Sequence, residues 1–103
     1  MAKLADAELN AFLSEMEGWT FLGNAIHKDF VFTGFRGAIA FVNRVAERAD
    51  AAGHHPDIEI HFNRVYISLS THDAGGVTEK DVALATGIDA AAESNAAAEP
   101  PGG

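Results

Sequence analysis

Two strictly alternating runs, separated by only two residues, constrain this chain more than any other feature of its sequence. The runs are PDIEIHF at 56–62 and VYISLSTH at 65–72, and in both of them apolar side chains recur at every second position. Such alternation predicts two β-strands with one buried face each, and Asn63-Arg64 between them predicts a two-residue hairpin turn. The chain must therefore contain antiparallel strands that cover a core.

Two stretches with helical periodicity precede this hairpin. Residues 35–49 carry one continuous apolar stripe, and we expect Thr33 to cap this helix and Gly53 to end it. Near the N-terminus, apolar residues spaced i, i+3, i+4 and i+7 predict a shorter helix that starts at Asp6 and stops at Gly18.

The remaining elements complete a regular order. The segment GWTFLGNAIHKDFVFTG at 18–34 predicts a second hairpin, turned at Gly23-Asn24. Thr78 and Asp81 form a predicted capping box at the start of a last helix, where Asp81 is most simply a helix-start residue stabilised by the helix dipole. The order helix, two strands, helix, two strands, helix predicts an α+β fold with three helices on one face of a four-stranded antiparallel sheet.

Length and composition indicate one small domain. The chain has 103 residues, of which 48% are hydrophobic, and this is enough for a single core. We expect the domain to cover residues 1–92 and a disordered Ala/Pro/Gly-rich tail to cover 93–103. A domain this small buries only about two-thirds of its unfolded surface, and its sheet must have edges. We therefore expect a homo-oligomer.

Charge and cysteine content exclude several classes of function. The formal net charge of −8, with only seven basic residues, argues against nucleic acid and anionic membranes as partners. Without cysteine, the chain has no disulfide framework, thiolate metal site or cysteine nucleophile. The N-terminal stretch lacks the apolar run of a signal peptide, and no segment approaches transmembrane length, which predicts a cytoplasmic protein.

Three of the five histidines bracket the 56–72 hairpin. With Asn63-Arg64 as the turn, His55 faces His72 across the strands, and His54 lies where helix meets strand. Asp50 precedes His54 by one helical turn and can orient an imidazole or hold it protonated. Imidazole has an ordinary pKa of about 6.5, so this cluster can accept and donate protons near neutral pH, as general acid–base catalysis requires.

Two other interpretations of these residues remain open. A single histidine at the end of a helix or strand is more often a surface residue than part of a site. Neutral imidazoles beside a carboxylate can also bind zinc or iron, although adjacent side chains such as those of His54 and His55 diverge and seldom ligate one ion.

Several motifs resemble those of a known family in order and spacing. They are DAAGHHP at 50–56, FNRV at 62–65 and THDAGGVTEKD at 71–81, together with WTF at 19–21 and the helix at 35–50. The whole string is similar to that of the pterin-4a-carbinolamine dehydratases, also called dimerisation cofactors, and the similarity extends over residues 4–90. It is far more specific than a lone His-His-Pro.

The resemblance implies a reaction and a site. The reaction is dehydration of 4a-hydroxytetrahydropterin to quinonoid dihydropterin, which recycles the cofactor of aromatic amino acid hydroxylases and needs no metal or organic cofactor. The resemblance also implies the same α+β fold and a dimer or tetramer. In this family His54, His55 and His72 would form the acid–base set, with Asp50 orienting them. The residues that it assigns to substrate binding are Pro56, Asp57, Thr71 and Asp73.

Three positions depart from the family pattern. Asp50 is shorter than the Glu of many members, Ile58 stands where some have Trp, and Phe62 stands where many have Tyr. Ile58 and Phe62 lie on the apolar side of the strand, so we expect these changes to affect substrate affinity more than catalysis.

A non-catalytic role is the alternative function. Some relatives act as a transcriptional coactivator, and others are similar to factors that assist assembly of Rubisco, so the fold alone does not identify an enzyme. A pure scaffold or assembly factor has no need for one acid and three histidines. Because all four are present here, the sequence favours the dehydratase.

Overall fold

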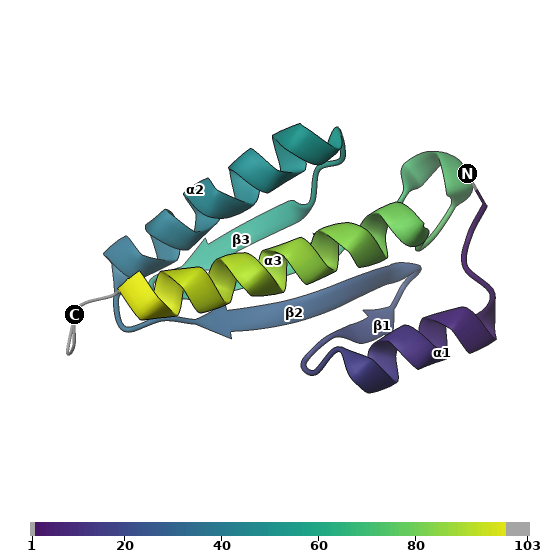
Figure 1. Ribbon diagram of the computed structural model, residues 1–103, viewed down its shortest axis with the longest axis horizontal. Helices are drawn as coiled ribbons and strands as arrows, with labels where there is room; N and C mark the ends of the chain where they lie inside the picture. Colours follow the sequence, from purple (N-terminus) through teal and green to yellow (C-terminus); the bar gives the residue numbers. More distant parts are fainter. Residues whose placement is uncertain (1, 99–103) are drawn as a thin grey trace.

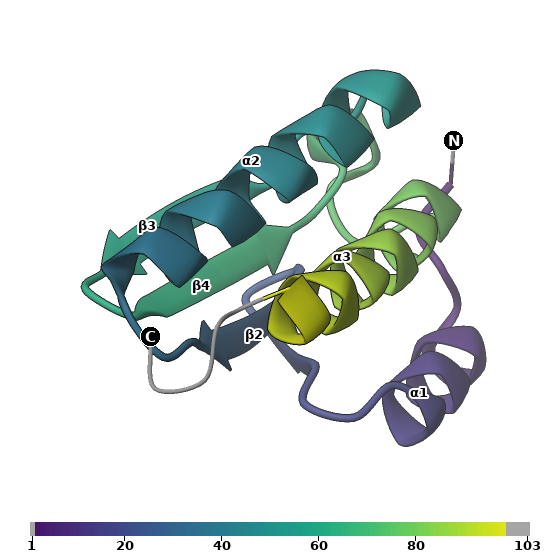
Figure 2. The same ribbon diagram turned by 60° about the vertical axis from the view of Figure 1, so that its left-hand side comes forward.

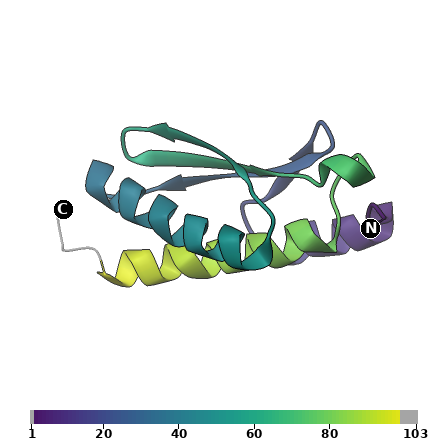
Figure 3. The same cartoon turned by 90° about the horizontal axis from the view of Figure 1, so that it is seen from above.

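The computed structural model describes residues 2–98. Its elements are α1 (Asp6–Glu15), β1 (Thr20–Leu22), β2 (Ala25–Val31), α2 (Phe35–Ala52), β3 (Asp57–His61), β4 (Arg64–Leu69), the short 3₁₀ helix η1 (His72–Ala74) and α3 (Glu79–Ala98). The strands form an antiparallel sheet in the order β1-β2-β4-β3 (Figures 1 and 2). Figure 3 shows the three helices on one face of this sheet, which confirms the predicted α+β fold.

The core fills the space between the sheet and the helices. Phe41 of α2 is fully buried, and its ring lies 4.8 Å from that of Phe30 and 4.9 Å from that of Phe32, measured between centroids. The alternation predicted for β4 is confirmed, because every second side chain of this strand is buried: Val65, Ile67 and Leu69.

Two helix starts differ from the predicted caps by one residue. The N-cap of α1 is Ala5 instead of Asp6, and the side chain of Glu8 accepts a hydrogen bond from the Ala5 backbone N–H at 3.1 Å. The N-cap of α2 is Gly34, one residue after the expected Thr33. None of the helices within residues 2–98 is long and apolar enough to cross a bilayer.

The β3–β4 hairpin turns one residue earlier than predicted. His61 pairs with Arg64, so the turn residues are Phe62 and Asn63. Phe62 has a φ of 53°, a left-handed conformation that costs a non-glycine residue about 1–2 kcal/mol. The turn is held from outside: Asn63 donates its side-chain N–H to the Phe32 carbonyl at 2.9 Å, and its own carbonyl accepts the Phe32 N–H at 2.8 Å. These contacts with the end of β2 fix a turn that the local sequence does not favour.

The observed register shifts each predicted cross-strand pair by two residues. Val65 pairs with Ile60 instead of Phe62. Because the shift is an even number, every side chain keeps its predicted face of the sheet. Extending the ladder beyond its last pair aligns His54 with Thr71, so the predicted facing of His55 and His72 is wrong.

Helix α3 continues to Ala98, beyond residue 92, where we expected the domain to end. Asn95 explains this, since its side chain is buried and bonded to α2. Its amide donates to the Gly37 carbonyl at 3.0 Å, and its side-chain oxygen accepts from Nε of Arg44 at 3.3 Å. The rest of the expected tail, residues 99–103, lies outside the described residues.

Candidate active site

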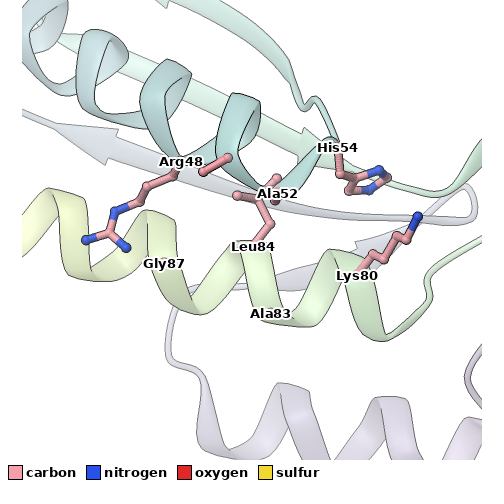
Figure 4. A pocket seen from close by; sticks show the side chains of 8 residues that line it. Arg48, Ala52, His54, Lys80, Ala83, Leu84 and Gly87 are labelled. Carbon is pink, nitrogen blue, oxygen red and sulfur yellow. The ribbon is translucent and has the colours of Figure 1, made fainter.

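The candidate site forms where α2 ends and the chain enters β3. Gly53 has a φ of 62°, and this left-handed conformation, which glycine adopts without steric cost, ends α2 as predicted. The chain then carries His54 to the first turn of α3, where it lies near Lys80 (Figure 4). Elements that are distant in sequence therefore meet around one histidine.

Asp81 of α3 is the partner of His54. Its Oδ1 lies 2.5 Å from Nε2 of His54, and the carboxylate is fully buried while the histidine side chain is 13% exposed. A buried carboxylate is tolerated only when its oxygens accept hydrogen bonds. Here Oδ2 accepts the backbone N–H of Thr78 at 2.9 Å and the hydroxyl of Thr71 at 2.8 Å. Asp81 thus joins the start of α3, the end of β4 and His54.

The same carboxylate caps helix α3. Asp81 accepts the Thr78 N–H at 2.9 Å, as the predicted capping box requires, while the Thr78 hydroxyl accepts the backbone N–H of Lys80 at 3.3 Å in place of that of Asp81. Sequence reasoning found this role of Asp81 and missed its bond to His54. One sequence feature could have indicated this bond: Asp81 is the last residue of the THDAGGVTEKD motif, which contributes to the family resemblance.

Asp50 lies beside His55 and not beside His54. Its Oδ1 is 3.1 Å from Nε2 of His55, and the two side chains are 80% and 67% exposed, respectively. Solvent screens such a pair, which therefore contributes little to stability. The two adjacent histidines thus each have an aspartate partner, one pair buried and the other in solvent.

His72 is exposed at the start of η1, directly after Thr71. Within residues 2–98, no hydrogen bond or ion pair joins two of the three histidines directly. Among the same residues, no three His, Asp or Glu side chains lie so that they could hold a metal ion. His54 is connected to the His72 segment through Asp81 and Thr71.

The four residues expected to bind substrate occupy different environments. The hydroxyl of Thr71 already bonds to Asp81 and to the Thr78 hydroxyl. Of the others, Pro56 is half-buried, and Asp57 and Asp73 are exposed.

A hollow of about 460 Å³ opens between the C-terminal half of α2 and the N-terminal half of α3, and His54 lies at one end of it (Figure 4). Its walls include Leu84 and several alanines, and the cations of Arg48 and Lys80 line it as well. The side chain of Arg48 packs against Gly87 of α3. A Cβ added to Gly87 would lie 3.3 Å from Nη1 of Arg48. His54 therefore borders a hollow with an apolar lining and two positive charges.

Comparisons with known proteins agree on one family. The family model described as pterin 4 alpha carbinolamine dehydratase matches residues 2–91. A Thermomicrobium roseum protein is 55% identical over 85 residues, which cover 82% of this chain and 91% of that protein. A Sulfurisphaera tokodaii protein is 47% identical over 89 residues, 86% of this chain and 96% of that one. Both relatives are provisionally named pterin-4-alpha-carbinolamine dehydratase.

Solved structures share the fold. A Brucella melitensis crystal structure, described as a transcriptional coactivator/pterin dehydratase, has a TM-score of 0.84 and 35% identity and covers 87% of this chain and 98% of its own. A pterin dehydratase-like protein, described as a RuBisCO assembly factor in the alpha-carboxysome, has a TM-score of 0.61 and 25% identity. The match covers 72% of this chain and 86% of that protein's chain.

Proposed function

The chain belongs to the pterin 4 alpha carbinolamine dehydratase family, and we propose that it is itself a dehydratase that converts 4a-hydroxytetrahydropterin to quinonoid dihydropterin. The pairing of His54 with Asp81 carries this proposal. Burial of an ionised carboxylate is costly, and a charged group held against an imidazole in this way is typical of sites that move protons.

The proposed reaction removes water across C4a and N5 of the pterin. The C4a–O bond breaks, N5 gives up its proton, and the electron pair of the N5–H bond forms the new C4a=N5 double bond. The hydroxyl group is protonated and leaves as water, so no electrons are exchanged with a redox partner. One histidine accepts the N5 proton and another protonates the hydroxyl, and we assign these tasks to His54, His55 and His72.

A direct assay tests the activity. The purified protein is expected to accelerate decay of 4a-hydroxytetrahydropterin generated in place by an aromatic amino acid hydroxylase and followed by ultraviolet absorbance. His55→Ala and His72→Ala should each lower the rate by at least about tenfold, because each removes a proton-transfer group. Both side chains are exposed, so thermal stability should not change.

His61→Ala is the matched control for that assay. His61 is an exposed histidine on β3 that also has an acidic partner, Glu59 at 3.3 Å, and it should retain the wild-type rate. A wild-type protein that leaves the spontaneous rate unchanged would contradict the proposal. That result would favour the alternative, a non-catalytic scaffold, since structural neighbours are described as a coactivator and an assembly factor.

We also propose that the protein is a homo-oligomer built on a dimer in which two copies pair along β3. This strand is at the edge of the sheet, and Ile60 on it and Phe62 in the following turn are 37% and 67% exposed. An open edge with apolar side chains favours pairing with another strand. Sedimentation velocity should show a dimer or tetramer at micromolar concentration, and a monomer throughout would contradict the pairing.

A further inference from the structure

We propose that Asp81, held by the Thr71 hydroxyl, fixes His54 in the tautomer with its proton on Nε2, so that Nδ1 is the nitrogen that exchanges a proton with the substrate. This inference rests on the proposed dehydratase function. It makes Thr71 a positioning residue, in place of the substrate contact that the family resemblance implies.

The donor and the acceptor of each hydrogen bond around Asp81 can be assigned, because the network ends on backbone N–H groups that can only donate. A backbone N–H can only donate, so the Thr78 hydroxyl accepts from Lys80. Thr71 gives its one hydroxyl proton to Oδ2 of Asp81, and the Thr78 hydroxyl, 2.8 Å from Oγ1 of Thr71, must then donate to Thr71. The Thr71 hydroxyl and the Thr78 N–H therefore both donate to Oδ2, and Oδ1 is the oxygen that faces Nε2 of His54. A carboxylate is a weaker base than an imidazole, so the proton between Oδ1 and Nε2 belongs to the imidazole and Asp81 is the acceptor.

The acceptor state of Asp81 determines the tautomer of His54. Nε2 lies 2.5 Å from Oδ1, and two lone pairs at that separation would repel each other. Nε2 must carry a proton. A neutral imidazole has only one ring proton, so Nδ1 carries the lone pair.

Nδ1 of His54 is also the accessible nitrogen. Within residues 2–98, every buried side-chain nitrogen or oxygen has a hydrogen-bond partner. The ring of His54 makes its hydrogen bond through Nε2, and Nδ1 has no partner within residues 2–98. Because it has no partner, Nδ1 cannot be buried, so it is accessible to solvent. The hollow in Figure 4, which His54 lines, gives a ligand a route to this ring.

This arrangement lets His54 change charge without moving. In its neutral form Nδ1 can accept the N5 proton, and as an imidazolium it can protonate the departing hydroxyl. In both states Nε2 keeps its proton and its bond to Asp81. The solvent-exposed His55–Asp50 pair has no comparable restraint, since both side chains are free to reorient.

Nitrogen-15 NMR of the histidine rings tests the tautomer without any substrate. At about pH 8.5, where imidazole is neutral, His54 is expected to show a protonated Nε2 and an unprotonated Nδ1. The exposed ring of His55 should show a mixture of tautomers and serves as the internal comparison. A His54 with its proton on Nδ1 would overturn the proposal, whatever the enzyme activity.

Asp81→Asn should invert the tautomer. Oδ2 receives two donors, so the Asn carbonyl oxygen will take that place and the amide NH₂ will face Nε2 of His54. Nε2 must then accept, and the ring proton moves to Nδ1. An unchanged His54 spectrum in this variant would count against control of the tautomer by Asp81.

Kinetics of Thr71→Val test the positioning role. Loss of the hydroxyl should lower kcat by about tenfold and leave KM unchanged, and Thr71→Ser should restore the rate. Thr86→Val is the matched control, because it removes a hydroxyl that bonds to the Val82 carbonyl at 3.1 Å on the exposed side of α3. A raised KM with unchanged kcat would identify Thr71 as a substrate contact and refute its positioning role. If the wild-type protein has no dehydratase activity, the proposed function fails, while the NMR result still decides the tautomer.

Discussion

His54→Gln is expected to lower the dehydration rate by about 10²–10⁴-fold, the usual contribution of a general acid or base, while the protein stays folded. The glutamine amide can still donate a hydrogen bond to Oδ1 of Asp81, so the buried carboxylate keeps a donor in that position. An amide cannot act as a general acid or base near neutral pH, so the chemistry is lost. Steady-state kinetics and thermal unfolding of the same preparation measure both effects.

Two further variants make this result specific. His54→Ala removes the donor as well as the ring, so it should lower the rate equally and also destabilise the fold by about 1–3 kcal/mol. His61→Gln makes the same chemical change at an exposed histidine and should alter neither property. A His54→Gln enzyme with the wild-type rate would remove His54 from the mechanism.

Phe41→Ala is expected to reduce the free energy of unfolding by about 3–5 kcal/mol. Phe41 is fully buried and contacts the rings of Phe30 and Phe32, which couple α2 to the sheet. A protein of this size has a total stability of only about 5–15 kcal/mol, so the loss is a large share of it. Urea denaturation followed by circular dichroism provides the measurement.

Phe35→Ala is the matched control for the core. It removes the same ring from the same helix, but Phe35 is 51% exposed, so the loss should remain below about 1 kcal/mol. Equal effects at the two positions would mean that the buried stripe of α2 is not what holds the helix to the sheet.

The element order and the buried faces could be predicted because both depend on local periodicity. The alternation of 65–69 and the apolar spacing of 35–49 are both visible within a few residues of sequence, although Phe35, which begins the predicted stripe, is 51% exposed, while Phe41 is fully buried. The hairpin turn could not be predicted, because it is fixed by the hydrogen bonds between Asn63 and Phe32 and by the pairing of β4 with β2. A left-handed Phe62 has no local sequence signal in its favour.

For the candidate site, the sequence indicates which residues to consider but not which of them contact each other. His54 and Asp50 were both identified, but the carboxylate that holds His54 comes from a residue 27 positions later in the chain. Asp81 already had a sufficient local explanation as the capping residue of α3, which left no unexplained feature to draw attention to it. The string of residues that carries the family resemblance includes Asp81, but a string does not say which of its members contact each other.

The two tasks of Asp81 have an evolutionary consequence. Selection for folding alone would retain this aspartate, because α3 needs it at its first turn even in a lineage that has abandoned chemistry. Folding requires of His54 only a donor to Asp81, which a glutamine also supplies, so the ring itself would be free to change. Among homologues of uncertain role, substitution at the position of His54 should therefore mark the loss of an enzyme, whereas survival of the aspartate proves nothing.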